Sequence, residues 1–523
     1  MKINLKLYSI LICLLMPVIA AAQQDKEIMQ AASIELTQHK SLWFNTKNAS
    51  GLLSTPLADY SEVSVAYKNE SGKFARLQQG DLSTLSVNTH GAIQIGETML
   101  WGNFTYDNIT VKNSLYNTLL YDPFREMPYN AVDANKSNWK KQSYLLNAKV
   151  AFPMLWDFLA IGCEIDYNSR TGAKQLDPRT TNYNYFINVR PGFSFHFAKN
   201  HILGFNLEYE NYYERTTPTN SDSQNYQPVY LLKGLGVYTN EIIGGSNGLK
   251  AFYYKANKIG IAGQYAFNSN GAFKMLLDAG YTYKVEDVYQ TPTKPQRMGT
   301  VKQKAVNATA QFLVDGQKNT HKAVIKYANE NTDGIEYIQY VDNSEDVNDW
   351  VTLDKYIRSN YKYTDFAFTY NYFRESDRGY SWNAGFEGKY SDNDDIYYLP
   401  ESKMRIRNFV MDFFVKKNFS FGPKSTLLFG LDFAFNSNME GMFSFPADKT
   451  PEQMEFIENF YNKDLAILSS NYTKIGALLN FATVVKNKTS LFFKVNIDYY
   501  KPGASLNSSD NRVGVLGSIG INF

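Results

Sequence analysis

The feature that most constrains this chain is an alternation of apolar and polar residues, sustained from Lys141 to the last residue, Phe523. Side chains of a β-strand point to opposite faces in turn, so a period of two residues predicts strands with one apolar face. Short turn-forming sequences and longer polar segments separate these strands alternately. A closed barrel in a bilayer satisfies such a pattern, because lipid accepts the apolar faces and closure removes the open edges. The pattern predicts an all-β fold, a transmembrane antiparallel β-barrel.

The last strand is the clearest example of this pattern. Within residues 512–523 the apolar side chains share one parity and end in Ile519, Ile521 and Phe523, while glycine, serine and asparagine occupy the other parity. An apolar strand at an open edge would recruit other chains in a soluble protein. The ending resembles the terminal strand of bacterial outer-membrane barrels, which implies that Phe523, Ile521 and Ile519 form a signal for the barrel-assembly machinery.

The start of the chain predicts export. Lys2 and Lys6 precede an apolar run that is too short to span a bilayer, and three alanines at 20–22 supply a small-residue cleavage site. We predict that residues 1–22 are a signal peptide and that residues 59–523 form the barrel. Residues 23–58 would then be an N-terminal segment in the lumen or the periplasm. The expected location is the outer membrane of a Gram-negative bacterium, with outer-membrane lipid as a partner.

The charge balance argues against nucleic acid as a partner. The whole chain has a formal charge of +2, and removal of Lys2 and Lys6 with the signal peptide brings it to 0. Nucleic-acid binding requires a basic surface, so we expect none. The aromatic content of 15%, with 39 Tyr and 35 Phe, fits the aromatic girdles of a membrane barrel.

Counting hairpins backwards from Phe523 favours eighteen strands, with sixteen as the alternative if the first two candidate strands do not join the wall. The short turns then lie on the periplasmic side together with the C-terminus. Longer polar segments are predicted as outer loops near 168–181, 216–249, 334–353, 391–403, 439–464 and 501–511.

One outer segment has the sequence of a helix. Thr450 is a typical N-cap, Pro451 suits the first helical position and Gln453 completes a capping box. An apolar stripe follows, so we predict a short amphipathic helix over 450–463. A lid, a docking element and simple packing on neighbouring loops are all consistent with it.

Charged residues recur on the parity opposite to the apolar faces. Ionisable groups are costly in hydrocarbon, so this parity must face water or other charged groups. A wet lumen and a lumen filled with cross-strand ion pairs both fit. The candidate lumen-lining residues are Lys149, Glu164, Asp166, Arg190, Glu208, Asp278, Lys326, Glu387, Asp412, Asp432, Lys494 and Asp498.

The sequence offers little for catalysis. None of the five histidines falls near a predicted outer loop, no pair of histidines has zinc spacing and no repeated calcium-loop motif occurs. Cys163 is the one cysteine left after cleavage, so no disulfide within the chain is expected. We predict no enzyme, no bound metal and no cofactor.

Several short motifs stand out along the chain: Trp43 with Asn48–Leu52, Trp101–Tyr106, Pro128-Tyr129, Asp177-Pro178-Arg179 and Pro191-Gly192. With these motifs the chain resembles a family of Bacteroidota outer-membrane β-barrels of unknown function. The resemblance implies a barrel and a Bacteroidota source but no substrate, and Thr180 replaces a proline of the family pattern. The Asn48–Leu52 stretch is also similar to the entry motif of long-chain fatty-acid channels, with Ala49 in place of proline.

Together these patterns favour a passive channel or capture protein for nutrient uptake, with a small molecule or amphiphile as its ligand. The alternative is a barrel that transports nothing and serves as a scaffold or subunit of a larger outer-membrane uptake or secretion complex. The two differ in whether the lumen holds a continuous wet path or is filled by the N-terminal segment and inward ion pairs.

Overall fold

The computed structural model describes residues 30–55, 57–120, 127–222, 227–243, 250–269, 271–291, 294–344, 349–446, 450–486, 489–503 and 510–523. The predicted signal peptide, residues 1–22, lies outside the described residues, as do the first seven residues of the predicted N-terminal segment, 23–29.

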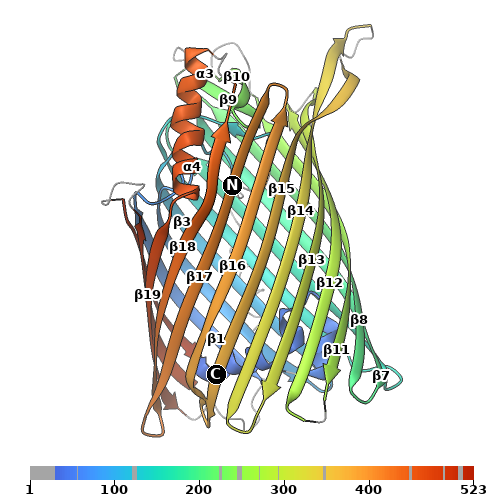
Figure 1. Cartoon of the computed structure of the whole chain (residues 1–523), viewed down its shortest axis with the longest axis vertical. Coiled ribbons are helices and arrows are strands. Elements are labelled where there is room, and N and C mark those ends of the chain that lie inside the picture. The colour runs from blue at the N-terminus through green and yellow to red at the C-terminus, as the bar shows by residue number, and fades with distance from the viewer. Residues whose placement is uncertain are drawn as a thin grey trace, which may run out of the picture.

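Eighteen antiparallel strands close into a barrel (Figure 1). Consecutive barrel strands pair with one another, and β1 pairs with β21 to close the wall, with Val65 opposite Ile519. The barrel strands are β1 (Tyr60–Gly72), β2 (Asp81–Ile95), β3 (Thr98–Ser114), β5 (Ser137–Ala151), β6 (Leu159–Lys174), β7 (Arg179–Ala198), β8 (His201–Thr219), β11 (Phe252–Asn268), β12 (Phe273–Gln290), β13 (Gln296–Asp315), β14 (Asn319–Asp342), β15 (Asp349–Ser376), β16 (Gly379–Tyr398), β17 (Glu401–Phe421), β18 (Ser425–Ser444), β19 (Tyr472–Lys486), β20 (Thr489–Pro502) and β21 (Arg512–Asn522). The expectation of an all-β barrel with about eighteen strands is confirmed.

The wall has an apolar outer face and a polar inner face, as the alternation requires. On β18, Leu431 and Phe433 are 46% and 44% exposed on the outside. Asp432 between them points inward and pairs with Lys474 at 2.9 Å. Ile519 and Ile521 on β21 are exposed outward in the same way.

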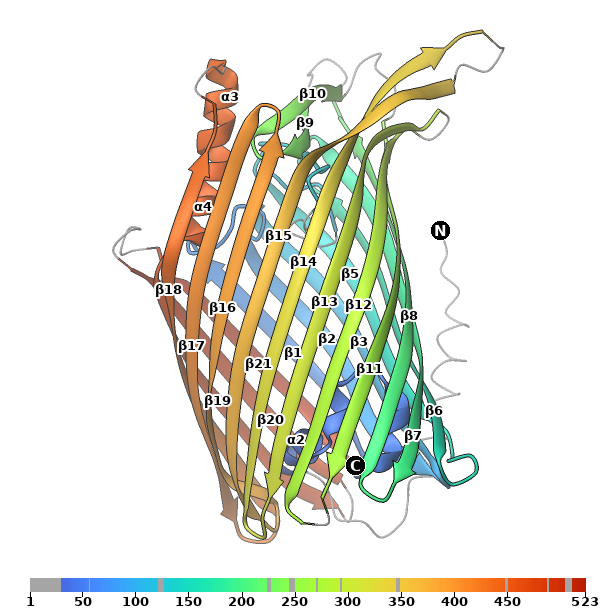
Figure 2. The same cartoon turned by 45° about the vertical axis from the view of Figure 1, so that its right-hand side comes forward.

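The two ends of the barrel differ (Figures 1 and 2). The turn end, at the bottom of both views, carries short connections such as the one between β7 and β8, and Phe523, which pairs with Ser61 through two backbone hydrogen bonds. The loop end, at the top, carries the longer connections. There β14 and β15 extend beyond their neighbours as a projecting hairpin.

Several predicted outer loops are shorter than expected, because the strands continue through polar sequence. β6 runs to Lys174, β14 runs to Asp342 and β16 runs to Tyr398. Outside the apolar band of the wall a strand needs no apolar face, so the alternation fades while the backbone pairing persists. The acidic stretch at 392–395 is therefore part of β16, where Asp392 pairs with Arg405 and Arg407.

The connection between β8 and β11 contains a small second sheet. Its strands are β9 (Gln227–Gly234) and β10 (Val237–Ile243), and β4 (Ala131–Val132), from the β3–β5 connection, pairs with β9. The segment 216–249, predicted as a polar loop, is thus largely structured where it is described.

The predicted outer helix is present. It comprises α3 (Pro451–Phe456), the π-helical turn η4 (Ile457–Asn462) and α4 (Lys463–Leu468), and its capping box between Thr450 and Gln453 is complete. Phe456 and Phe460 pack against tyrosines of the β3–β5 connection and the small sheet. Among the described residues, no helix is both long and apolar enough to cross a bilayer.

Candidate functional site in the barrel lumen

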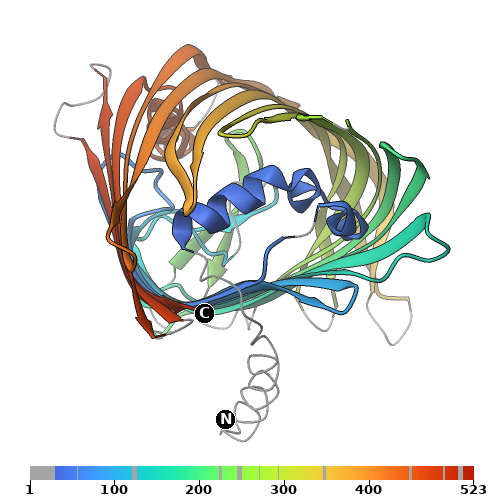
Figure 3. The same ribbon diagram turned by 90° about the horizontal axis from the view of Figure 1, so that it is seen from below.

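The described part of the N-terminal segment, residues 30–55, lies inside the barrel at its turn end, and we call it the plug (Figure 3). It consists of α2 (Ala31–Lys40) and two short 3-10 helices, η1 (Leu42–Asn45) and η2 (Ala49–Ser54). Its contacts run from β16 at one wall through β12 to β5, β6 and β7 at another. The plug therefore crosses the lumen.

Helix α2 is anchored to the wall by an apolar face and a charged face. Ala32 and Leu36 are buried against Phe373, Tyr380 and Leu428. On the charged face, Glu35 accepts a hydrogen bond from Tyr380 at 2.8 Å and pairs with Lys416 at 2.5 Å. Burial alone would raise the pKa of Glu35, but the Lys416 ammonium outweighs it and holds that pKa below its ordinary value.

The end of α2 makes a second set of charged contacts. Lys40 pairs with Asp315 at 2.8 Å and with Glu375 at 2.7 Å. Burial would lower the pKa of Lys40, but hydrogen bonds to these two carboxylates raise it overall. Lys322 of the wall donates to the backbone oxygen of His39 at 2.8 Å. Burial, with the nearby Lys322 ammonium, lowers the pKa of His39 to about 4, so this imidazole is neutral when docked at pH 7.

Trp43 anchors the middle of the plug. Its ring is buried in a cluster of aliphatic side chains from η1, β8, β11, β12 and β13. Gly51 of η2 lies directly against the ring, and a Cβ on Gly51 would overlap it. The Asn48–Leu52 motif therefore needs its glycine because two parts of the plug fold back on each other.

Asn48 fastens η2 to three strands. Its carboxamide oxygen accepts from the backbone of Ser50 and so caps η2. Its nitrogen donates to the backbone oxygens of Phe193 and Phe205 at 2.9 and 3.3 Å and to Gln264 at 3.0 Å. The capping makes the amide orientation specific, since only the nitrogen can donate to those carbonyls.

Glycines of the wall make room for this motif. A Cβ on Gly192 of β7 would overlap the Asn48 side chain, and one on Gly162 of β6 would overlap the backbone of Ser50. Gly192 belongs to one of the motifs behind the family resemblance. Trp101, from another, donates to Tyr60 at 3.2 Å and stacks edge-on with Phe44 of the plug. These motifs therefore serve plug docking.

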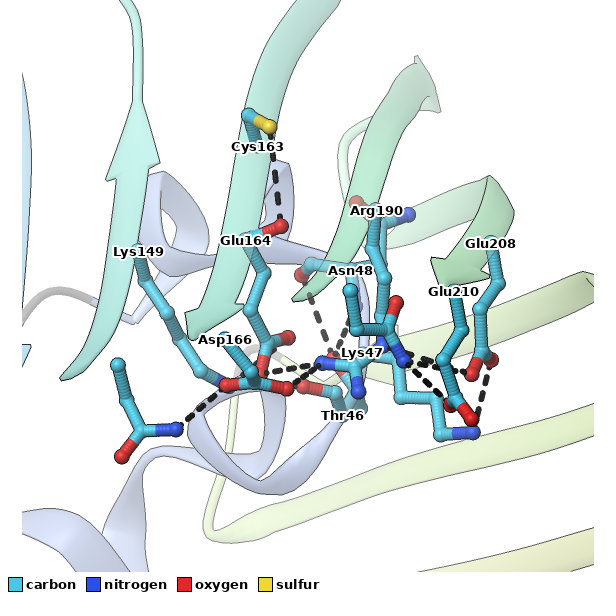
Figure 4. Close-up of polar contacts among 12 residues, drawn as sticks. Thr46, Lys47, Asn48, Lys149, Cys163, Glu164, Asp166, Arg190, Glu208 and Glu210 are labelled. Atoms are coloured by element: carbon cyan, nitrogen blue, oxygen red, sulfur yellow. Dashed lines mark hydrogen bonds and ion pairs between the residues drawn. The ribbon is translucent and has the colours of Figure 1, made fainter. Parts of the chain in front are cut away.

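The loop between Asn45 and Asn48 enters an ion-pair network (Figure 4). Lys47 pairs with Glu208 of β8 at 2.9 Å. Glu208 also pairs with Lys258 of β11 at 3.1 Å and accepts from Asn188. Lys258 pairs in addition with Glu210. Glu208 is nearly inaccessible to solvent, so its charge depends on these partners.

The same network continues on β5, β6 and β7. Arg190 pairs with Glu164 at 3.0 Å and with Asp166 at 2.7 Å. Lys149 lies 3.5 Å from Glu164 and donates to the plug backbone at Phe44 and Thr46, at 2.8 and 2.9 Å. Five of the predicted lumen-lining residues thus meet one another and the plug.

A second segment enters the lumen from the loop end. Residues 115–120 and 127–136, between β3 and β5, place Leu119, Met127 and Tyr129 in an apolar cluster with inward residues of the wall, including Tyr212 and Tyr254. We call this segment the inner loop. Gly299 of the wall leaves space for the Tyr129 ring, and a Cβ on Gly334 would lie 3.1 Å from the Tyr129 hydroxyl.

The lumen also contains a cavity of about 950 Å³. It is bounded by β1, β2, β3, β5 and β6, by β16 to β21, by Leu120 of the inner loop and by Leu468 of α4. Arg76, in the connection after β1, pairs with Asp464 of α4 and so joins the outer helix to this rim. The predicted residues Glu387, Asp412 and Asp498 line the cavity.

Two lysines pair with acidic groups on this wall. Lys389 of β16, which lines the cavity, pairs with Asp365 at 2.9 Å. Lys474 of β19 pairs with Asp432 at 2.9 Å and with Asp498 at 3.2 Å. One oxygen of Asp412 is buried and accepts no hydrogen bond from the described residues. This wall therefore carries more negative than positive charge.

The remaining predicted residues join neither cluster. Asp278 of β12 lies beside the plug network, where Gln264 donates to it at 3.4 Å. Lys326 of β14 has the inward parity of Lys322 but is exposed. Lys494 of β20 has the inward parity of Asp498.

Sequence analysis missed several residues of both clusters. Lys258 and Lys474 stand next to outward Ile259 and Ile475, so the same parity rule would have found them. Lys47 carries no such signal, because it precedes the barrel and meets Glu208 only through the path of the plug.

Comparison with known sequences identifies the family. A family model described as "Family of unknown function (DUF6850)" matches residues 49–523, and the chain belongs to that family. Among curated proteins none matches the chain.

Three solved structures that match the chain have low sequence identity to it. The FrpB iron transporter from Neisseria meningitidis (F3-3 variant) is 9% identical, with a TM-score of 0.43 over 91% of this chain and 83% of that one. The copper transporter OprC is 8% identical, with a TM-score of 0.41 over 88% and 80%. BauA, the ferric preacinetobactin receptor from Acinetobacter baumannii, is 8% identical, with a TM-score of 0.39 over 89% and 80%.

Proposed function

We propose that this protein captures a small nutrient at the outer membrane and admits it through a lumen that the plug gates. The observation that carries the proposal is the docking of the plug. At the wall formed by β13 to β17 it is held by groups that can separate reversibly, namely Glu35 with Lys416 and Lys40 with Asp315 and Glu375. At the other wall Lys47 pairs with Glu208 of β8. The lumenal cavity bounded by the inner loop and α4 has room for a bound ligand.

Single-channel recording in planar bilayers tests the gate. The wild-type chain should conduct little. The double variant Glu35→Gln, Lys40→Met should open, because it removes the charges that anchor α2, and deletion of residues 25–55 should open further. Glu330→Gln is the matched control, since Glu330 of β14 accepts a hydrogen bond from Gln303 of the wall, and it should behave as wild type.

Two results would overturn this proposal. A high, steady conductance of the wild-type protein would mean that the plug closes nothing. No conductance and no liposome swelling in any variant would defeat the conduit and leave the scaffold. The scaffold remains the second candidate because the network around Arg190 and Glu208 fills one side of the lumen with mutual ion pairs.

The proposal includes insertion in the outer membrane of a Gram-negative bacterium by the barrel-assembly machinery. Ile519 and Ile521 face outward and Phe523 pairs with Ser61 at the turn end. Phe523→Asp should therefore lower the amount of folded barrel in the membrane fraction while leaving the plug contacts intact. Normal surface abundance of this variant would refute the role of Phe523.

A further inference from the structure

We propose that the cavity between β5 and β17 binds a short zwitterionic peptide, with the ligand ammonium at Asp412 and Glu387 and the ligand carboxylate at Lys141. The proposal rests on the proposed function, because it assigns a class of ligand to the capture step. The argument comes from the charges on the two walls of the cavity and from what each charge already touches.

The acidic wall has unmet capacity for a cation. Asp412 of β17 has one buried oxygen that accepts no hydrogen bond from the described residues. Glu387 of β16 accepts from Thr369 at 2.9 Å, and Asp498 shares Lys474 with Asp432. A buried carboxylate oxygen without a donor is costly. An ammonium group, with three donors, would supply what this wall lacks.

The opposite wall offers cations. Besides Lys141, Arg170 of β6 and Arg512 of β21 line it, and Arg512 pairs with Glu70 at 3.3 Å. Lys141 of β5 lies 4.9 Å above the Trp139 ring and forms no salt bridge with the described residues. In the strand order, β5 and β17 are separated by nine strands in one direction and seven in the other, so they stand on opposite sides of the barrel. One cavity is therefore bounded by an acidic group at one side and a lysine at the other.

The space between the walls suits a chain of a few residues. The volume of about 950 Å³ is at the upper end of the range for small-ligand pockets, roughly 300–1,000 Å³. Phe74, Tyr472 and Tyr500 line it. The ring centroids of Phe74 and Tyr472 are 5.5 Å apart, and those of Tyr472 and Tyr500 are 6.2 Å apart. Asn408 and Asn436 add two carboxamide groups to the lining. The rings can hold an apolar side chain, and the amides can bond a peptide backbone.

Other ligand classes fit less well. A neutral sugar could stack on the rings but would bring no charge to pair with either wall. A polyanion would be repelled by Asp412 and Asp498, and a polycation by Lys141. A ligand with opposite charges at its two ends can form an ion pair with each wall.

The test is calorimetric titration of the full-length protein in detergent with the peptide Ala-Phe-Ala-Ala. Three related probes accompany it: the N-acetylated peptide, the C-amidated peptide and maltotriose. Free peptide should bind, and either cap should weaken binding about tenfold or more, the effect of losing a charged hydrogen bond. These ligand changes test the proposal without any substitution in the protein.

Variants assign each end of the ligand. Asp412→Asn should weaken the free peptide about tenfold but leave the already weak N-acetylated peptide unchanged. Lys141→Gln should do the same for the C-amidated peptide. Glu330→Gln and Lys326→Gln, which alter lumenal charges outside the cavity lining, are the controls and should bind as wild type.

Equal affinities for free and capped peptides, tighter binding of maltotriose, or equal losses in the control variants would each overturn the proposal. Failure of the ligand class is distinguishable from failure of the conduit. If no peptide binds but the plug variants conduct, the ligand class is wrong and the gate stands. If the peptide binds with the expected pattern and no variant conducts, the site is correct and the protein captures without passage.

Discussion

Charged side chains around the plug and those around the cavity differ in how fully they are paired within the protein. Around the plug, Glu208, Arg190, Lys149 and their neighbours find partners within the protein and are largely hidden from solvent. Around the cavity, one oxygen of Asp412 accepts no hydrogen bond and Lys141, over the Trp139 ring, forms no salt bridge with the part of the chain that the structure describes. Both sides arise from the same inward parity.

The difference separates a structural role from a binding role. A buried charge with all its partners in the chain is a fixed part of the fold, and removing one partner leaves the others buried without compensation. A charge with unused capacity beside an open volume can exchange water for a ligand. Parity places a charge in the lumen, but the number of its partners indicates what the charge does there.

The largest expected effect compares Glu208→Gln with Asp412→Asn. The first should destabilise the folded barrel by about 3–5 kcal/mol, because Lys47 and Lys258 would lose their shared buried carboxylate. The second should cost less than about 1 kcal/mol, since no partner in the chain depends on that oxygen. Thermal loss of the heat-modifiable band on gels measures both. Equal effects would erase the distinction between the two sides.

Acid should release the plug. The pKa of His39 is about 4 when docked and near 6.5 when free, and the pKa of Glu35 is lowered by docking. The released plug therefore binds more protons, so docking weakens as pH falls from 6.5, by about 3 kcal/mol from His39 once it is protonated in both states. Glu35 adds to the loss as pH falls below 4.5.

Conductance recorded at pH 7, 5.5 and 4 measures this release, with openings growing toward low pH. His39→Leu removes the titrating ring and should flatten the profile between pH 6.5 and 4. The same rise in His39→Leu as in wild type would show that His39 is not the group responsible.

The smallest expected effect compares two glycines. Gly192→Ala should weaken plug docking by about 1–3 kcal/mol, because its Cβ would overlap Asn48. Gly514→Ala, at the cavity, should be nearly neutral, since its Cβ would lie 3.5 Å from the Glu70 side chain, an ordinary contact. Tryptic cleavage at Lys40 and Lys47 of the folded protein reports an undocked plug. Protection in Gly192→Ala equal to wild type would contradict the docking geometry.

The sequence determined the architecture because alternation is local. The polarity of Leu431, Asp432 and Phe433 predicts which side of the wall each residue faces, and turn residues mark where one strand ends. The same rule placed Glu164, Arg190 and Asp498 in the lumen. It failed for polar strand ends such as the one at Tyr398, where nothing requires one face to be apolar.

Only the tertiary structure decided which of these charges belong together. Asn48 bonds Gln264 across 216 residues of sequence, and Lys47 meets Glu208 across 161. Those encounters depend on closure of the barrel and on the path of the plug through it, and neither leaves a periodic trace in the sequence. The same holds for the cavity, since β5 and β17 face each other only because β1 closes on β21. Local alternation determines which side of the wall a side chain faces, whereas the partner of that side chain depends on how the whole barrel closes.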